Sequence, residues 1–432
     1  MSWKGRNTVG VIQDLFGINT NTVMLAATGQ HVGKTTLSLG VFGSLEQKWG
    51  KGRVAYCKPL GQKYTDVVCN GKTLKVDNDV HVMRNYFKLQ DSWEHMSPVV
   101  FPPGYTRSHI DAPDRSQKTG ELLTKIKDSF THLATKSDFV LLEGSGHMGV
   151  GSIVNLNNAQ VAGALGADVV IIAPGGLGSS FDTLALNKAL IEKHGARLRG
   201  VILNKVQEDK CEMVEDYYSR QLEYLWGKPL LGCIPLKEAI SRPTITGFAE
   251  LLGADWLAGE SERHRTFETT RVVLTQAAAD SVVEVSAHNQ LIITNVECED
   301  VIEAVCQKHK ALLESSLGTE HLRGGLIVAG TSELRKDLRQ ELDLLGIPTV
   351  WVHRDGEAAK RGTTFEILKM INSYTQKHSS EDTGRVEDTM DHIRQHIDFE
   401  GLCQEIPLST RVKRAAVRGS VDTLLGRWRT WR

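Results

Sequence analysis

The chain has 432 residues, of which 41% are apolar and 24% charged, and its formal net charge is -1. Such a length predicts two or three domains at roughly 150 residues each. The near-neutral charge argues against a polyanion-binding protein, so no nucleic-acid partner is expected. No stretch approaches the ~20 consecutive apolar residues of a membrane-spanning helix.

The seven cysteines are scattered along the chain and include no C-x-x-C pair. This pattern predicts neither a disulfide framework nor a zinc site, and it is typical of a reducing compartment. We therefore expect a cytoplasmic protein. The opening residues contain Lys4 and Arg6 and no acid before Asp14, so an organelle-targeting signal stays an open alternative.

Short apolar runs alternate with longer helical patterns from about residue 22 to 235, which predicts parallel βαβ units. The runs are continuous, as expected for strands covered on both faces. The expected strands are Val23–Ala27, Val54–Cys57, Phe139–Leu142, Val169–Ala173 and Val201–Leu203. The expected helices are Thr36–Trp49, Glu121–Thr135, Ser180–His194 and Glu212–Leu225. Polar, turn-rich Tyr64–Val76 is expected to be a loop or a small excursion. The fold class is thus α/β, with a mostly parallel sheet and helices on both faces.

A second, smaller α/β domain is expected after a boundary near Ile240–Thr244. A short helix over Thr244–Leu252 and a polar stretch precede a strand–helix–strand–helix–strand run. That run comprises Leu291–Thr294, Cys298–Leu313, Gly325–Ala329, Ser332–Leu345 and Thr349–Val352. We assign residues 1–240 to the first domain, 241–375 to the second, and 376–432 to a polar linker with a basic tail. Residues 376–390 are polar enough to be expected as mobile.

The strongest motif follows the strand Val23–Ala27, where Gly33-Lys34-Thr35-Thr36 opens a helix. Backbone N–H groups and a helix N-terminus in this order attract phosphate. Lys34 is expected to contact the β- and γ-phosphates, and the Thr35 hydroxyl to bind Mg²⁺. The predicted nucleoside triphosphate loop contains Thr28, Gly29, Gln30, His31, Val32, Gly33, Lys34, Thr35 and Thr36. Thr28 stands where the usual pattern has a glycine.

Two charged residues follow expected strands at the carboxyl edge of the sheet, where open α/β sheets bind ligands. Glu143 comes after Phe139–Leu142, and its carboxylate suits Mg²⁺; the alternative is a helix cap or a surface acid. Lys58 comes after Val54–Cys57. It could stabilise charge that develops during phosphoryl or carboxyl transfer, or be an exposed lysine at a strand end.

The segment Asn204-Lys205-Val206-Gln207 bears on which nucleotide binds. Guanine recognition by an N-K-x-D pattern requires an acid at the fourth position, and Gln207 cannot provide that charge. The amide of Asn204 can instead pair with the donor and acceptor of adenine. ATP is therefore the predicted nucleotide.

These motifs together resemble the dethiobiotin synthetase and cobyrinic acid a,c-diamide synthase group of P-loop proteins. The matching pieces are the loop T-G-x-x-V-G-K-T, the segment Tyr56-Cys57-Lys58-Pro59, the E-G-x-G run at Glu143–Gly146, and Leu203-Asn204-Lys205. The resemblance implies a P-loop NTPase-like fold, with Thr35, Asp79 and Glu143 as ligands of Mg²⁺. It also implies catalytic roles for Lys34 and Lys58. Asp77 lies two residues from Asp79, so either could be the family's acid, and a helix cap is the alternative for Asp79.

The remainder, from Arg242 to about Thr375, resembles a DRTGG-type domain. The cues are PTITGFAELLGADWLAGE, the strand LIIT and the run GGLIVAGTSEL; the naming motif is absent, and Asn295 begins the segment in its place. The pairing of the two modules is similar to the N-terminal portion of long bacterial phosphotransacetylases. No acetyltransferase domain follows, so that activity is not expected.

Two functions remain open. The favoured one is a nucleotide-sensing regulatory protein with a protein partner. The alternative is an ATP-dependent ligase that activates a small carboxylate or carbamate by phosphorylation. A homodimer would fit related folds. His147 could be catalytic or structural, and the structural role is favoured. Apolar and basic residues of the tail, among them Leu425 and Trp428, could form an amphipathic helix on a membrane; packing or disorder of that tail is favoured.

Overall fold

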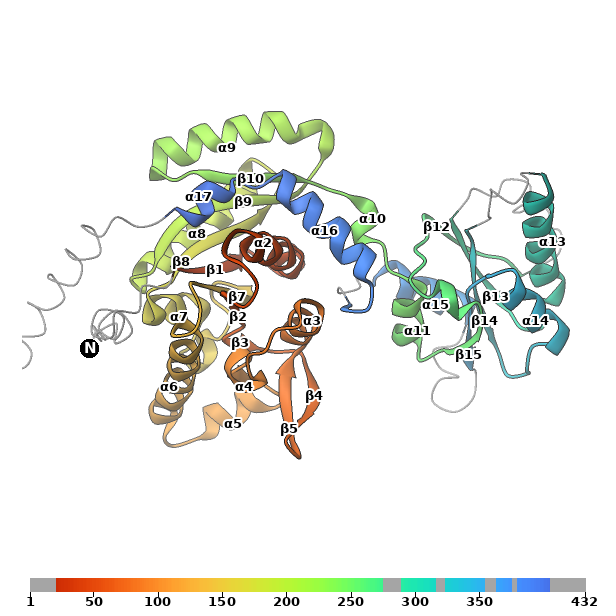
Figure 1. The fold of residues 1–432 in the computed structure, drawn as a ribbon, viewed down its shortest axis with the longest axis horizontal. Coiled ribbons are helices and arrows are strands. Elements are labelled where there is room, and N and C mark those ends of the chain that lie inside the picture. Colours follow the sequence, from red (N-terminus) through yellow and green to blue (C-terminus); the bar gives the residue numbers. More distant parts are fainter. Residues whose placement is uncertain (1–20, 275–288, 316–322, 354–362, 375–378, 405–432) are drawn as a thin grey trace, which may run out of the picture. The chain divides into compact units, whose positions relative to one another are not determined.

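The computed structural model describes residues 21–274, 289–315, 323–353, 363–374 and 379–404. The chain divides into two compact units, one of residues Met1–Leu236 with His378–Arg432 and one of residues Lys237–Lys377 (Figure 1). The second unit is therefore an insertion in the sequence of the first. The targeting signal considered before Asp14 and the amphipathic basic tail lie outside the described residues.

A six-stranded parallel sheet forms the centre of the first unit, in the order β10-β9-β8-β1-β7-β2. Its strands are β1 (Asn21–Ala27), β2 (Val54–Cys57), β7 (Phe139–His147), β8 (Asp168–Pro174), β9 (Arg197–Val206) and β10 (Leu230–Pro235). The expected α/β class with a mostly parallel sheet is confirmed. In β1 the two faces alternate, because Met24 and Ala26 enter one hydrophobic cluster while Val23 and Leu25 enter the other.

Helices cover both faces of this sheet. The Met24 face is covered by α6 (Arg115–Ala134), α7 (Asn158–Leu165), α8 (Gly178–Lys193) and α9 (Cys211–Trp226). The Val23 face is covered by α2 (Lys34–Trp49), α3 (Asn78–Phe87), α16 (Thr383–Gln395) and α17 (Phe399–Cys403). Smaller elements of this unit are α4 (Trp93–Met96), α5 (Tyr105–Asp111) and the paired strands β3 (Leu60–Gly61) and β6 (Val99–Val100). The short helix α10 (Glu238–Ser241) begins the second unit. Among the described helices, none combines the length and the hydropathy needed to span a bilayer.

Of the two alternatives for Tyr64–Val76, the loop is wrong: this segment is a small excursion from the main sheet, an antiparallel hairpin of β4 (Tyr64–Cys69) and β5 (Lys72–Asp77). Its two-residue turn is Asn70-Gly71, with φ values of 51° and 74°. Asn-Gly is a strong signal for this type of turn, since both residues tolerate positive φ. The hairpin delivers Asp77 to the start of α3.

Helix α16 is a second correction, since residues 376–390 were expected to be a mobile linker. The described part of this segment is mostly helical and packs on α2. Buried Val386, Thr389 and Ile393, with half-buried Met390, form its inner side, and most of the other residues are polar. A Cβ on Gly40 of α2 would lie 2.4 Å from Ile393, so the two helices approach closely because Gly40 has no side chain.

The second unit has a five-stranded sheet in the order β11-β15-β14-β13-β12, in which only the edge strand β11 is antiparallel to its neighbour. The strands are β11 (Asp255–Ala258), β12 (Thr269–Val272), β13 (Gln290–Asn295), β14 (Gly325–Gly330) and β15 (Thr349–His353). Helices α13 (Glu299–Ser315) and α14 (Lys336–Leu344) cover one face, and α11 (Ile245–Leu252) and α15 (Thr364–Asn372) the other. This is a second, smaller α/β domain with its own core.

Candidate functional site

The loop between β1 and α2 has the geometry of a phosphate-binding turn. Gly33 is the N-cap of α2 and has φ 98°, a left-handed conformation that favours glycine. A Cβ at this position would also lie 2.3 Å from the side-chain nitrogen of Asn204. Both the backbone conformation and the close approach of Asn204 thus require glycine at position 33. The first turn of α2 contains no acid of its own, and the positive end of the helix faces the loop.

Lys34 folds back over this loop, and its Nζ donates to the carbonyl of Gly29 at 3.3 Å. The start of the loop is tied to β8, because Thr28 N donates to Ile172 O at 2.9 Å. The ammonium group therefore lies above the loop backbone, where a phosphate chain would need a cation.

Two residues at the end of β9 hold the loop from the other side. Asn204 is buried, and its Nδ2 donates to Val32 O at 2.8 Å. The neighbouring Lys205 donates from Nζ to His31 O at 2.9 Å. The amide nitrogen of Asn204 therefore supports the phosphate loop, a role that the sequence did not reveal. Its pairing with adenine stays a prediction.

A buried ionic cluster lies at the same edge of the sheet. Nζ of Lys58, directly after β2, lies 3.0 Å from Asp77 Oδ1 and 3.6 Å from Glu143 Oε1, and it also forms an ion pair with Asp79. All four residues are at most 5% exposed. Lys58 as an exposed strand-end lysine and Glu143 as a surface acid or helix cap are thus wrong. When all four groups are ionised, three negative charges and one positive charge leave a net charge of -2.

Asp77 and Asp79 have different partners. Asp77 is the N-cap of α3, and its carboxylate accepts from Asp79 N at 2.9 Å and from Gln62 N at 3.3 Å. The carboxylate of Asp79 pairs with Lys58. Asp77 is therefore the helix cap of the pair. A metal-ligand role for Asp79 stays a prediction.

Glu143 is held by groups from both neighbouring elements. Its Oε2 accepts a hydrogen bond of 2.8 Å from the hydroxyl of Tyr56 in β2, and its Oε1 accepts one of 3.5 Å from Thr35 Oγ1 in α2. Tyr56 is fully buried. Sequence reasoning missed it as a site residue, because a tyrosine within an apolar run gives no indication of which partner its hydroxyl finds.

Burial and ion pairing act against each other on the pKa values of this cluster. Burial lowers the pKa of Lys58, but the charges of Asp79, Glu143 and Asp77 outweigh burial and raise that pKa overall. Burial raises the pKa of Glu143 and of Asp77, and Lys58 offsets only part of this. Lys58 thus stays cationic, whereas the carboxylates are short of positive charge.

The donor chemistry of the cluster fits a hard divalent cation. Thr35, Asp79 and Glu143 offer hydroxyl and carboxylate oxygens, which Mg²⁺ prefers, and the excess negative charge favours a cation. In the described part of the chain, no three His, Cys, Asp or Glu side chains are arranged to hold a metal ion. The acids converge on the Lys58 ammonium instead.

His147, at the end of β7, makes local contacts. Its Nδ1 accepts from Gly149 N at 3.1 Å, and its carbonyl accepts from Asn158 Nδ2 at 2.8 Å. These bonds fix the turn after the strand. They support the structural role that the sequence favoured.

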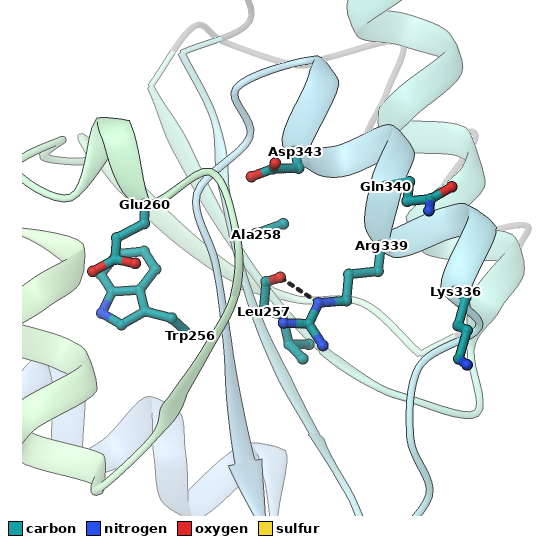
Figure 2. Close-up of a pocket in the computed structure, with 8 residues that line it drawn as sticks. All are labelled: Trp256, Leu257, Ala258, Glu260, Lys336, Arg339, Gln340 and Asp343. Atoms are coloured by element: carbon teal, nitrogen blue, oxygen red, sulfur yellow. Dashed lines mark hydrogen bonds between the residues drawn. The ribbon is translucent and has the colours of Figure 1, made fainter.

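A surface pocket of about 470 Å³ lies entirely within the second unit, between β11 and α14 (Figure 2). Its lining residues are Trp256, Leu257, Ala258, Glu260, Lys336, Arg339, Gln340 and Asp343. Arg339 Nε donates to Leu257 O at 2.7 Å, and Gly259 N donates to Asp343 Oδ1 at 2.9 Å. These two bonds join the helix to backbone groups of β11 and of Gly259 just after it, and so stabilise the edge of the sheet.

Comparison with known proteins supports the nucleotide site. A family model described as an AAA domain, AAA_26, matches residues 21–244. The chain is 28% identical to a phosphate acetyltransferase of Synechocystis over 307 residues, which cover 68% of this chain and 40% of that protein. It is 27% identical to the ATP-dependent dethiobiotin synthetase BioD of Clostridium kluyveri over 196 residues, 43% of this chain and 75% of that enzyme. The chain spans between two-fifths and about half of the matching phosphate acetyltransferases.

Solved structures include the MinD cell division protein of Aquifex aeolicus, which is 15% identical, with a TM-score of 0.31. That match covers 51% of this chain and 84% of that protein. The family match and the geometry of the loop together identify a nucleotide-binding P-loop domain.

Proposed function

The chain belongs to the AAA_26 family of AAA domains, and on that premise we propose that it is a Mg-ATP-binding, nucleotide-sensing regulatory protein. The observation that carries this proposal is the position of α2. Its first turn bears Lys34 and Thr35 at the phosphate loop, and its body packs against α16. The second unit is inserted immediately before α16 in the sequence.

ATP and magnesium are the proposed ligands of the loop. The triphosphate would lie along the amides of Thr28–Thr36, with Lys34 neutralising its charge. Thr35, Asp79 and Glu143 would hold Mg²⁺, which supplies electrostatic stabilisation of the phosphates. Gln207 supports adenine over guanine, and the relative BioD is named an ATP-dependent enzyme.

The regulatory part of the proposal rests on chain connectivity. We take the second unit to be a DRTGG-like domain, on the sequence cues alone. It joins the first unit after β10 and before α16. A change at the phosphate loop could therefore reach the inserted unit through α2 and α16, provided that nucleotide binds two states of the protein with different affinity. A partner protein that reads the second unit completes the proposal.

Calorimetry with ATP and Mg²⁺ tests the nucleotide site. The wild-type protein should bind, and Lys34→Ala should lose binding, because the substitution removes the ammonium group that lies over Gly29 of the loop. Circular dichroism should show an intact fold, and Lys72→Ala, which alters an exposed lysine of the hairpin, should bind as the wild type does. Unchanged ATP affinity in Lys34→Ala would refute the assignment.

A synthetase is the second candidate, favoured by Lys58 beside the site and by the match to BioD. Here Lys58 would contact the phosphate and a carboxylate or carbamate acceptor, which requires a second substrate. ATP consumption that rises with added small carboxylic acids would support this candidate. Tight ATP binding with negligible turnover would support the sensor.

A further inference from the structure

We propose that the Lys58 ammonium holds the place of the divalent cation, and that Lys58 leaves the three carboxylates when the cation binds. The inference rests on the magnesium site of the proposed function. It adds a regulation of that site, since Lys58 would reach the phosphates or an acceptor only after the ion has arrived.

One carboxylate oxygen links the two cation positions. Oε1 of Glu143 lies 3.6 Å from Lys58 Nζ and 3.5 Å from Thr35 Oγ1. The lysine therefore occupies the space beside the same oxygen that the phosphate-loop threonine reaches. A divalent ion bound by Thr35 and Glu143 would contact Glu143 Oε1, the atom that the Lys58 ammonium group now faces.

The charges in the cluster favour exchange of the monovalent ammonium group for a divalent cation. Three buried carboxylates and one ammonium group leave a net charge of -2 when all four groups are ionised. An unbalanced buried charge is costly. A divalent cation would cancel this excess, whereas Lys58 alone leaves it in place.

Two of the three acids, Glu143 and Asp77, have supports that do not depend on Lys58. Glu143 is held by the Tyr56 hydroxyl, and Asp77 by the backbone amides of Asp79 and Gln62. They can therefore keep their positions when the ammonium group moves away.

Lys58 is the member of the cluster whose charged group can move without a change in its backbone. Its backbone is fixed, because its N–H donates to Met96 O at 2.8 Å. Its side chain has a flexible four-carbon stem, so the ammonium group can move while the backbone stays in place. The exchange requires this side chain to rotate while its backbone stays in place.

The experiment removes the ammonium group and adds the ion without nucleotide. Lys58→Met should unfold at a lower temperature than the wild type, because it leaves the acids uncompensated. Millimolar Mg²⁺ should restore most of that loss, and Mn²⁺ should bind Lys58→Met about tenfold or more tightly than the wild type. The control is Arg197→Met, which removes one of the two arginines paired with buried Asp168 at the opposite edge of the sheet; Arg199 stays 3.5 Å from it. Mg²⁺ should give this variant no recovery.

Equal Mn²⁺ affinity in Lys58→Met and wild type, or equal Mg²⁺ recovery in the Arg197→Met control, would overturn the proposal. If Lys58→Met does not fold, the wild type provides the test through amine labelling followed by mass spectrometry. Lys58 should be protected without metal and become reactive with Mg²⁺, while exposed Lys72 stays equally reactive. Protection that Mg²⁺ leaves unchanged or increases would contradict the exchange. Wild-type calorimetry with ATP reports separately on the proposed function, because these measurements contain no nucleotide.

Discussion

At the scale of single residues, the site depends on groups that hold other groups in place. Asn204 and Lys205 fix the carbonyls of the phosphate loop, and Tyr56 fixes Glu143. In these three hydrogen bonds the side chains contact other protein groups and not the expected position of the phosphates. Their contribution is to keep the loop amides and the acid in position before a ligand arrives, which lowers the entropy lost on binding.

Tyr56→Phe tests this positioning role. The substitution keeps the ring in the core and removes the bond to Glu143 Oε2, so the carboxylate can rotate. We expect the Mg²⁺ concentration needed for nucleotide binding to rise by about 10- to 100-fold, as for other residues that orient metal ligands. Calorimetric titrations at several Mg²⁺ concentrations measure the effect.

Tyr218→Phe is the matched control, since Tyr218 is also buried and donates from its hydroxyl to Gly176 O. It should lower stability by a similar amount, about 0.5–1.5 kcal/mol. Its Mg²⁺ dependence should be that of the wild type. An equal shift in both variants would mean that Tyr56 acts only through general stability.

Gln207→Asp tests the predicted choice of base. An acid at this position can accept from the N1 and N2 donors of guanine, so the variant should gain affinity for GTP relative to ATP. Gln207→Asn, which adds no charge, should keep the preference for ATP. A competition titration decides the matter, and equal affinity of the wild type for ATP and GTP would remove the argument.

The sequence predicted which residues lie together at the sheet edge better than it predicted the contacts among them. Lys34, Thr35, Lys58 and Glu143 could be found because each follows an apolar run at one sheet edge, and parallel strands bring such positions together. The choice between Asp77 and Asp79 could not be made, because it depends on which carboxylate turns back to cap α3. Tyr56 gave no signal, since its partner comes from β7, which follows far along the chain.

At the scale of elements, the contact between α2 and α16 joins the helix that follows the phosphate loop to a helix near residue 390. Gly40 and Gly43 of α2 face Ile393 and Met390 of α16, and a Cβ on either glycine would overlap the facing side chain. Two helices can come this close only where one of them has glycine at the points of contact. The pairing of these two faces is therefore specific.

Gly40→Ala should separate the helices. A methyl group 2.4 Å from Ile393 overpacks the contact, and we expect a loss of about 1–3 kcal/mol in the free energy of unfolding. In a protein that already carries Ile393→Ala, Gly40→Ala should cost less stability than it does in the wild type, because the shorter side chain leaves space for the methyl group. Chemical denaturation measures all three variants.

Gly120→Ala is the control for this experiment. Gly120 also lies within a helix, α6, but a Cβ there would meet nothing within 4 Å. The substitution should raise stability slightly, by up to about 1 kcal/mol, because alanine favours helix. A stabilising Gly40→Ala would show that α16 does not pack on α2 as described.

The hydrophobic patterns found most helices and strands but could not place α16. Its segment is polar apart from a narrow buried stripe, and a surface helix with such a stripe resembles a linker in composition. The hairpin of β4 and β5 was missed for a related reason, since its residues are largely exposed. Packing against α2 determines the structure of α16, and the Asn70-Gly71 turn determines that of the hairpin.

At the scale of the whole molecule, the second unit is an insertion rather than an appended domain. The chain leaves the first unit at Leu236 and returns to it at His378. The return to the first unit could not be predicted from composition, because it depends on the packing of α16 against α2. This connectivity gives the inserted unit two covalent links to the nucleotide-binding unit.

Hydrogen exchange with and without Mg-ATP tests the central claim of nucleotide sensing most directly. In the wild type, ATP should change amide protection in the loop Thr28–Thr36, in α16 and in the second unit; in Lys34→Ala, the same addition should change none of them. Protection that changes only around the loop, with α16 and the second unit unaffected, would contradict the account.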